Sequence, residues 1–218
     1  MTVPPAFARG VTLAGGGPFG ADDLAAARAR APSLVAADGG ADRLAALGAV
    51  PEAVIGDMDS LRGTLPDGVT AIPVTEQDST DFAKCLRHVE APLFIGVGFL
   101  GGRLDHTLAA LSVLLEHAAK RIVLLGEEDV AAIVPPGRPL HLEPGARVSF
   151  YPLLPCTGIA SEGLRWPVEG LNMAAGGTVG TSNEAASARV SARFGPNGIV
   201  TILPKRFLGA MVDALEDG

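Results

Sequence analysis

The sequence has few cysteines and no long uninterrupted apolar run. Its two cysteines, Cys85 and Cys156, are too few for a disulfide framework and lack metal-ligand spacing, so we expect ordinary core or boundary residues. No stretch approaches the roughly 20 apolar residues that span a bilayer. The first residues also lack the basic segment and apolar run of a signal peptide. These absences predict a cytoplasmic protein that does not enter the membrane.

Positive charge is also scarce. The 17 Lys and Arg residues face 24 Asp and Glu residues, which gives a formal net charge of −7. A general nucleic-acid binder normally has a basic face, so nucleic acid is not expected as a partner. A phosphorylated substrate is not excluded, because bound magnesium and a few local Arg or Lys residues can neutralise it.

The first part of the chain alternates short apolar runs with Ala- and Leu-rich segments of helical period. This alternation is typical of βαβ units, and it predicts a mostly parallel, Rossmann-like α/β sheet with helices on its faces. Strands are expected at residues 11–14, 34–37, 54–55, 70–74, 93–97 and 121–125, and helices at 21–30, 41–47, 82–88 and 104–120.

After about Val134 the chain becomes rich in Gly, Ser, Thr and Val, and turn signals separate its apolar runs. This texture predicts an all-β unit, a small β-sandwich, that ends in a short helix at 208–215. We place the domain boundary between residues 133 and 134, giving an α/β domain at 1–133 and a β-sandwich domain at 134–218. The β-strands are expected at 147–151, 178–181, 188–194 and 199–203.

The first segment that carries chemistry is Asp38-Gly39-Gly40, which lies between an expected strand and an expected helix. Asp38 should therefore lie at the carboxyl end of the sheet, where open α/β folds bind ligands. The two glycines let a ligand approach the backbone closely. Taken alone, a helix N-cap followed by turn glycines explains the segment equally well.

The second segment contains Asp57 and Asp59, two residues apart on extended chain, so that both carboxylates project to the same side. Neighbouring carboxylates repel each other, and a cation would relieve that repulsion. Hard oxygen ligands of this kind suit magnesium. A solvated loop is the alternative, because the Asp-x-Asp pattern is frequent by chance.

The third segment precedes an expected helix, whose free amide groups and dipole favour phosphate. Ser79 and Thr80 add hydroxyl donors, and Lys84, one turn into the helix, can reach an anion. Asp78 and Asp81 lie at the same helix end. One of them is expected to cap the helix, and two more carboxylates beside a phosphate site again suggest a metal.

The fourth segment combines paired glycines with Arg103, Asp105 and His106, again between a strand and a helix. A guanidinium suits phosphate because of its planar fork of donors. For His106 alone a capping or core role is favoured, whereas the group as a whole favours a binding site. The glycines at 15–17 are a weaker phosphate-loop signal, because they lack the ending of a Walker loop.

The fifth segment, in the β domain, contains Ser182 and Asn183 within residues 180–184. Small hydroxyl and amide side chains can hydrogen-bond a polar heterocycle, but they also form ordinary turns. Trp166 is the only tryptophan. It either stacks on an aromatic ligand or fills the core of the sandwich, and the core interpretation is slightly favoured.

Four of these segments follow strands of the predicted parallel sheet, so they should converge on one edge of it. Six carboxylates at one edge would repel each other strongly without a divalent metal. The residues therefore indicate metal-dependent phosphoryl chemistry, without naming the acceptor. The carboxylates are those of Asp38, Asp57, Asp59, Asp78, Asp81 and Asp105.

The order and spacing of five motifs resemble those of thiamine pyrophosphokinases, over about residues 10–205. The match departs little: Met58 and Leu104 stand where the family often has Phe, an exchange of one apolar residue for another. The motifs lie at residues 38–40, 56–60, 77–82, 101–106 and 182–184.

The resemblance implies an ATP- and Mg²⁺-dependent enzyme that moves pyrophosphate to the hydroxyl of thiamine. It implies a homodimer with active sites where the subunits meet, and magnesium near Asp57, Asp59 and Asp81. Thiamine is expected partly against Ser182 and Asn183 of the other subunit, with Trp166 as a further candidate contact.

By this mechanism the thiamine hydroxyl attacks the β-phosphorus of ATP in line, and AMP leaves. Such transfers depend mostly on positioning and charge neutralisation. Arg103 and Lys84 are expected on phosphate oxygens, and Asp81 is one candidate for the group that accepts the hydroxyl proton. The catalytic set is then Asp57, Asp59, Asp81 and Arg103, and the nucleotide site contains Asp38, Gly39, Asp78, Ser79, Thr80, Lys84, Arg103, Asp105 and His106.

Two alternatives remain open at this point. A metal-dependent phosphohydrolase or nucleotidyltransferase also uses Asp-x-Asp motifs, and it would release AMP or phosphate without requiring thiamine. A non-catalytic sensor of thiamine or nucleotide would need a broken set of acidic residues, and here the set is intact.

Overall fold

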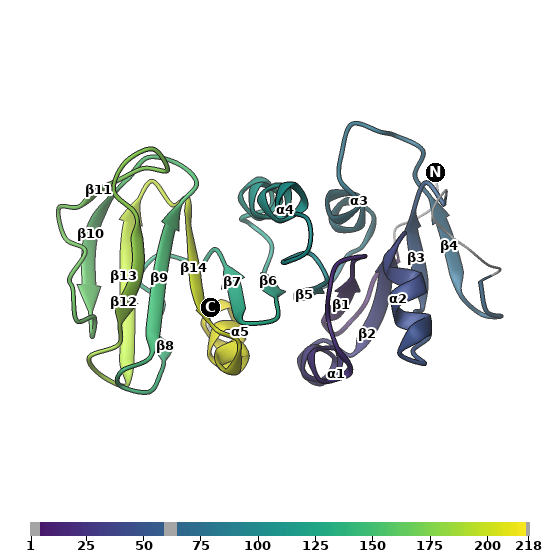
Figure 1. Cartoon of the computed structure of the whole chain (residues 1–218), viewed down its shortest axis with the longest axis horizontal. Helices are drawn as coiled ribbons and strands as arrows, with labels where there is room; N and C mark the ends of the chain where they lie inside the picture. Colours follow the sequence, from purple (N-terminus) through teal and green to yellow (C-terminus); the bar gives the residue numbers. More distant parts are fainter. Residues whose placement is uncertain (1–4, 59–64, 217–218) are drawn as a thin grey trace. The chain divides into compact units, whose positions relative to one another are not determined.

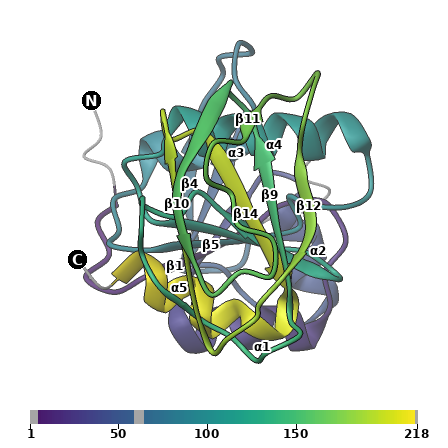
Figure 2. The same cartoon turned by 90° about the vertical axis from the view of Figure 1, so that its left-hand side faces the viewer.

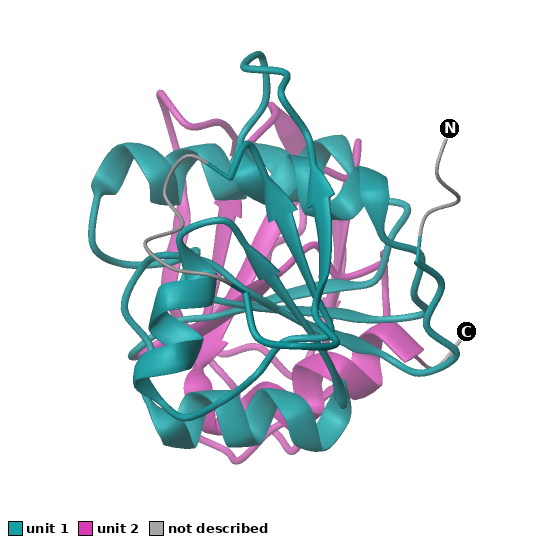
Figure 3. Cartoon of the chain, turned by 90° about the vertical axis from the view of Figure 1, so that its right-hand side faces the viewer, with its two compact units in different colours: residues 1–127 teal, residues 128–218 magenta. Residues whose placement is uncertain are grey.

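The structure is a computed structural model that describes residues 5–58 and 65–216. The chain divides into two compact units, a first unit of residues 1–127 and a second unit of residues 128–218 (Figure 3). This division comes earlier than the boundary predicted at 133/134. The reason is that β7 (Asp129–Ala132) pairs antiparallel with β14 (Ile199–Pro204), which belongs to the second unit.

The first unit is built on a parallel sheet with the strand order β6-β5-β1-β2-β3-β4. Four of these strands, β1, β3, β5 and β6, are buried along their whole length, as expected of apolar runs covered on both faces. The strands are β1 (Val11–Ala14), β2 (Ser33–Ala37), β3 (Ala53–Gly56), β4 (Thr70–Pro73), β5 (Phe94–Val97) and β6 (Ile122–Leu125).

Helices cover both faces of this sheet (Figure 1). In that view α1 (Ala21–Arg30) and α2 (Gly40–Ala46) lie below the strands, and α3 (Asp81–His88) and α4 (Leu104–Glu116) lie above them. The predicted mixed α/β architecture is therefore confirmed. None of the helices within the described residues has the length and apolar character needed to cross a membrane.

The strand order changes direction at β1, because β2 lies on one side of it and β5 on the other. The loops that follow β1 and β5 approach each other closely: the amide of Gly17 donates to the carbonyl of Gly98 at 2.9 Å. A Cβ at Gly17 would lie 2.6 Å from that carbonyl oxygen, and one at Gly15 2.7 Å from it. The glycine run after β1 therefore permits this approach at the switch point of the sheet, where open α/β folds bind ligands.

The second unit contains two antiparallel sheets, with the strand orders β12-β9-β14-β7 and β11-β10-β13-β8 (Figure 2). The rings of Phe150 on β9 and Phe194 on β13 lie 5.2 Å apart and join the two sheets through their apolar sides. The remaining elements are β8 (Leu140–His141), β9 (Arg147–Pro152), β10 (Cys156–Glu162), β11 (Asn172–Met173), β12 (Gly180–Glu184), β13 (Arg189–Gly195), the 3-10 turn η1 (Lys205–Phe207) and α5 (Leu208–Glu216).

Candidate active site

The segments singled out in the first unit all follow strands of one parallel sheet. Asp38 directly follows β2, Asp57 directly follows β3, and the loop that leads to Arg103 follows β5. Parallel strands place their carboxyl ends at a common edge, so these segments share that edge. The contacts described below show which of their side chains meet there.

Asp38 is buried, with 3% of its surface exposed, between the ends of β2 and β3. Its amide donates to the carbonyl of Ile55 at 3.0 Å. A Cβ at Gly56 would lie 2.6 Å from the Cβ of Asp38, so the bare backbone at Gly56 leaves room for the aspartate. The N-cap position of α2 is occupied by Gly39, without a side-chain cap. The alternative that Asp38 is simply a helix cap is therefore not supported.

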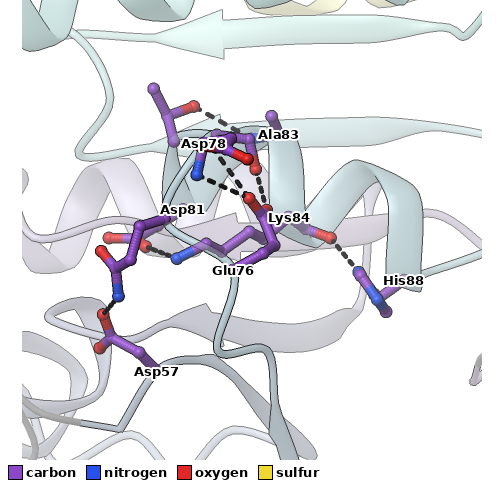
Figure 4. Close-up of polar contacts among 10 residues, drawn as sticks. Asp57, Glu76, Asp78, Asp81, Ala83, Lys84 and His88 are labelled. Atoms are coloured by element: carbon purple, nitrogen blue, oxygen red, sulfur yellow. Dashed lines mark hydrogen bonds and ion pairs between the residues drawn. The ribbon is translucent and has the colours of Figure 1, made fainter.

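Asp57 is held from the loop that precedes α3. The side-chain amide of Gln77 donates to its carboxylate at 3.1 Å, which connects the end of β3 to that loop (Figure 4). Asp59, the other half of the Asp-x-Asp motif, lies outside the described residues. Gln77 was part of a recognised motif, but sequence reasoning assigned it no role, because a glutamine beside several acids gives no charge signal.

Glu76 organises the same loop from its other side. Its Oε2 accepts hydrogen bonds from the amides of Asp78 at 2.9 Å and Ser79 at 3.1 Å, and its Oε1 accepts one from the Ser79 hydroxyl (Figure 4). The bond from the Ser79 hydroxyl lowers the pKa of Glu76 below its ordinary value, and the two amides act in the same direction. Both donors of Ser79 are directed at Glu76, so a phosphate contact from Ser79 would require these bonds to change.

At the start of α3 the N-cap is Thr80 and not Asp78 or Asp81 as predicted, and its hydroxyl accepts a hydrogen bond from the amide of Ala83 at 3.2 Å. Asp81 opens the helix and lies 3.5 Å from the ammonium of Lys84, measured between Oδ1 and Nζ. Lys84 is only 2% exposed. A buried lysine normally requires an anionic partner, so this cation is well placed to serve an anion at the helix N-terminus.

The neighbouring Cys85 is fully buried, and burial raises the pKa of its thiol. Cys156, in the second unit, is also buried, and burial raises its pKa in the same way. A thiol that stays protonated is a poor nucleophile and a poor metal ligand. The prediction that both cysteines are ordinary buried residues is confirmed.

The segment before α4 is exposed and pairs internally. The guanidinium of Arg103 meets both carboxylate oxygens of Asp105, at 2.6 and 3.1 Å, and the amide of His106 donates to Asp105 at 3.0 Å. The hydrogen bond from Arg103 lowers the pKa of Asp105. Asp78 is likewise exposed at the surface of the loop before α3. Arg103 would have to exchange Asp105 for a phosphate oxygen in order to act as predicted.

The carboxylates of this edge thus have local partners that sequence reasoning missed: Gln77 for Asp57, Lys84 for Asp81 and Arg103 for Asp105. Within residues 5–58 and 65–216, no three His, Cys, Asp or Glu side chains gather closely enough to hold a metal ion. The oxygen donors of Asp57 and Asp81 are nevertheless of the type that magnesium prefers. The donor set fits this metal in its chemistry, and a site that includes Asp59 stays a prediction.

In the second unit, the predicted thiamine residues lie on β12 and on the loop between β10 and β11. Asn183 is buried, and its side-chain amide makes two hydrogen bonds to the backbone of Trp166. Oδ1 accepts from the Trp166 N–H at 3.2 Å, and Nδ2 donates to the Trp166 carbonyl at 2.7 Å. The Trp166 side chain is 51% exposed, so the interpretation that it fills the core is wrong. The guanidinium of Arg165 lies over its ring, 4.8 Å from the centroid.

Two family models match the chain, one within each unit. Residues 25–125 match the family described as "Thiamin pyrophosphokinase, catalytic domain", and residues 139–194 match "Thiamin pyrophosphokinase, vitamin B1 binding domain". Together these matches take in more than half of the sequence. The chain belongs to the thiamine pyrophosphokinase family. The predicted resemblance is confirmed.

Curated thiamine pyrophosphokinases align over part of their length. Thiamine pyrophosphokinase 1 of Oryza sativa subsp. japonica is 31% identical over 154 residues, which cover 61% of this chain and 58% of the rice protein. Thiamine pyrophosphokinase 1 of Arabidopsis thaliana is 27% identical over 177 residues, covering 72% of this chain and 66% of that protein. The chain therefore spans less than two thirds of these relatives.

Solved thiamine pyrophosphokinase structures share the fold. The protein from Geobacillus thermodenitrificans superposes with a TM-score of 0.72 and 24% identity, covering 89% of this chain and 96% of that one. The protein from Candida albicans gives a TM-score of 0.75 and 17% identity, with 94% of each chain covered. At these identities the likeness establishes the architecture.

Proposed function

We propose that this chain is a kinase that transfers pyrophosphate from ATP to the hydroxyl of thiamine, giving thiamine diphosphate and AMP. The observation that carries the proposal is the N-terminus of α3. There a buried ammonium (Lys84), a carboxylate (Asp81) and the first turn of a helix lie at the same sheet edge as Asp57. The order of a catalytic and a vitamin B1 binding match along one chain supports thiamine as the acceptor.

Each residue at this edge has its own proposed role. The first amides of α3 and the ammonium of Lys84 attract phosphate oxygens, because the helix dipole and the buried cation add at one point. Gln77 keeps the Asp57 carboxylate oriented toward the same edge. Asp81, which is half-exposed and bonded to Lys84, is placed to hold the proton of an attacking hydroxyl.

Magnesium would be held by Asp57, Asp59 and Asp81, and it would supply charge neutralisation for the triphosphate. Arg103, released from Asp105, adds a fork of donors for the same oxygens. Phosphoryl transfers need positioning and charge neutralisation more than covalent help, and this set of residues would supply both.

Further parts of the proposal concern architecture and assembly. The first unit would be a Rossmann-like domain, and the two sheets of the second unit would form a β-sandwich. Two copies would form a cytoplasmic homodimer. Each active site would then combine the nucleotide site of one subunit with the thiamine residues of the other, which are Ser182, Asn183 and Trp166. Light scattering at micromolar concentration tests this assembly, and a monomer would contradict the shared site.

The reaction is tested with purified protein, ATP, magnesium and thiamine in a mass-resolved assay, omitting each component in turn. We expect thiamine diphosphate and AMP to appear together and only with magnesium. AMP or phosphate without a thiamine requirement would favour the hydrolase or nucleotidyltransferase, and thiamine that binds unchanged would favour a sensor. Thiamine monophosphate with ADP would retain the substrate but contradict the two-phosphate transfer.

The site is tested by removing one charge at a time while keeping the side-chain shape. Asp57→Asn and Asp81→Asn should each lower kcat on the order of 100-fold or more, because charge stabilisation at the transition state is lost. Asp67→Asn is the matched control, since this exposed residue precedes β4 and so lies away from the carboxyl edge. Turnover near that of the wild type for the two test variants would contradict the assignment.

A further inference from the structure

A short antiparallel ladder joins residues 163–166 to residues 183–186 in the second unit. The amide of Ala186 donates to the carbonyl of Gly163 at 2.7 Å, and that of Arg165 donates to the carbonyl of Glu184 at 2.9 Å. Between these bonds lies an antiparallel bridge between Leu164 and Ala185. Continued by one residue, this register places Trp166 opposite Asn183.

At that last position the partner of Trp166 is a side chain. The amide of Asn183 accepts from the Trp166 N–H through Oδ1 at 3.2 Å and donates to the Trp166 carbonyl through Nδ2 at 2.7 Å. A primary amide carries a donor and an acceptor on one planar group, as a peptide does. Asn183 therefore continues the ladder with its side chain, and it bonds Trp166 as a neighbouring strand would.

A β-bulge in β12 directly precedes Asn183. Gly180 pairs with Phe150 of β9 and Asn183 pairs with Val148, so two residues of β12 stand opposite the single residue Ser149. Ser182, inside the bulge, has a φ of 61°, which is uncommon for a residue other than glycine. Its amide donates to the hydroxyl of the buried Ser149 at 3.0 Å.

The bulge therefore has a buried support of its own, and such a conformation persists only where its surroundings hold it. Just past the bulge, the Asn183 side chain is 8% exposed, and its Oδ1 also accepts from the amide of Glu184 at 2.8 Å. Two acceptor contacts and one donor contact use most of the bonding capacity of this amide. Little remains for a direct bond to a ligand.

The part of Trp166 that is free to meet a ligand is its ring. About half of the side chain is exposed, and the guanidinium of Arg165 lies over the ring at 4.8 Å. Arg165 is held in turn by the carboxylate of Glu184, at 3.2 Å. The indole is thus fixed through its backbone by Asn183 and through one ring face by Arg165.

We infer that Asn183 is a positioning residue, which holds the Trp166 ring for stacking against an aromatic ligand and does not itself bind that ligand. Naming the ligand as thiamine rests on the proposed function. The placement of the ring by Asn183 does not, because it can be measured on the protein alone.

The first experiment uses the fluorescence of Trp166, which is the only tryptophan in the chain. In the ligand-free protein, Asn183→Ala should make the indole more mobile. Its fluorescence anisotropy should then decay faster, and its emission should shift to the red. Asn183→Asp, which keeps the acceptor but loses the donor, should give an intermediate value. Asn172→Ala removes another side-chain hydrogen bond of the same unit, to Thr157, and should leave the signal unchanged.

Circular dichroism checks that each variant is folded, and Asn183→Asp carries the test alone if Asn183→Ala does not fold. Indole mobility equal to the wild type in the folded Asn183 variants would overturn the inference. Because no thiamine is present, this result does not depend on whether the protein proves to be a thiamine enzyme.

The second experiment is a double-mutant cycle on the KM for thiamine. Asn183→Ala should raise KM about tenfold with little change in kcat, if the lost bonds weaken the placement of the ring by an amount typical of hydrogen bonds. In a Trp166→Ala background, Asn183→Ala should have no further effect, because the group it positions is gone. Effects that add fully would show a direct contact between Asn183 and thiamine, and would overturn the inference.

Discussion

The side-chain amide of Gln77 donates a hydrogen bond of 3.1 Å to the carboxylate of Asp57, and so joins the loop before α3 to the end of β3. The amide carries no charge, yet it fixes the orientation of a carboxylate that the proposed site requires. A neutral donor leaves the charge of Asp57 available to a cation, whereas a lysine at this position would neutralise it.

Gln77→Glu should shift the pH dependence of the enzyme further than Gln77→Ala does. A carboxylate beside Asp57 disfavours its ionised form and raises its pKa, so the active form is lost at a higher pH. We expect the acid limb of the kcat/KM profile to move upward most in Gln77→Glu, which adds a negative charge, and less in Gln77→Ala, which loses only a neutral donor. Coincident profiles for the two variants would show that position 77 does not affect the charge of Asp57.

Glu76 should contribute to stability only above acidic pH. Its folded pKa is depressed, chiefly by the Ser79 hydroxyl, so its contribution is fully present above the ordinary value of 4.5. That contribution is lost as the pH falls through the lowered folded pKa. Glu76→Gln should therefore lose less stability than the wild type on acidification from about pH 5 to about pH 3, as measured by urea unfolding.

The exposed Glu127 provides a control for this measurement, since Glu127→Gln should keep the pH dependence of the wild type. If Glu76→Gln and the wild type lose stability in parallel over the same interval, the hydrogen bonds from Ser79 and Asp78 do not couple to folding.

Lys84→Met should separate stability from activity. The ammonium is buried and lies 3.5 Å from a carboxylate that is half-exposed, so removing the cation leaves Asp81 solvated. Removing one partner of a buried ion pair is costly when the other charge stays buried, but here the remaining carboxylate is solvated and the desolvation cost of the ammonium is removed. We expect a thermal midpoint at or above that of the wild type, with kcat lowered on the order of 100-fold because phosphate charge is no longer neutralised. Wild-type turnover would make Lys84 a structural residue.

The strands and helices of the first unit were predictable because periodicity and burial agree there. The helix at 21–30 and the strand at 11–14 have the predicted bounds, since Asp22 and Asp23 mark the first turn of the helix and residues 11–14 form a short apolar run. In the second unit β8 and β11 have two residues each and offer no pattern. β10 contains Gly158, where a Cβ would lie 1.9 Å from the Val168 carbonyl oxygen. A glycine is needed there because of this close contact, which cannot be read from the sequence.

The position of the site in the fold could be predicted from the sequence, but most of its side-chain contacts could not. That Asp38 and Asp57 follow neighbouring parallel strands can be read from the strand pattern. The partner of a carboxylate depends on loop conformation, so the bonds from Gln77 to Asp57 and from Lys84 to Asp81 could not be predicted from the sequence. Similarly, the bonds from Asn183 to the backbone of Trp166 come from a residue just past the bulge at Ser182, and a bulge has no clear signature in residues 180–184.

Gly40→Ala should destabilise the first unit. A Cβ at Gly40 would lie 2.0 Å from the carbonyl oxygen of Ala14, a backbone atom at the end of β1 that cannot turn away as a side chain would. Either α2 or the end of β1 must then move, and we expect a loss of about 1–3 kcal/mol or more in the free energy of unfolding, followed by urea and far-ultraviolet circular dichroism.

Gly209→Ala is the matched control for this change. Gly209 lies in α5, and a Cβ there would meet nothing within 4 Å. Alanine in a helix is favoured over glycine by about 0.5–1 kcal/mol, so this variant should be slightly more stable than the wild type. Equal stability of Gly40→Ala and Gly209→Ala would mean that the close approach of α2 to β1 is not needed. Because Asp38 and Gly39 lie between β2 and α2, the arrangement proposed for them would then have to be abandoned as well.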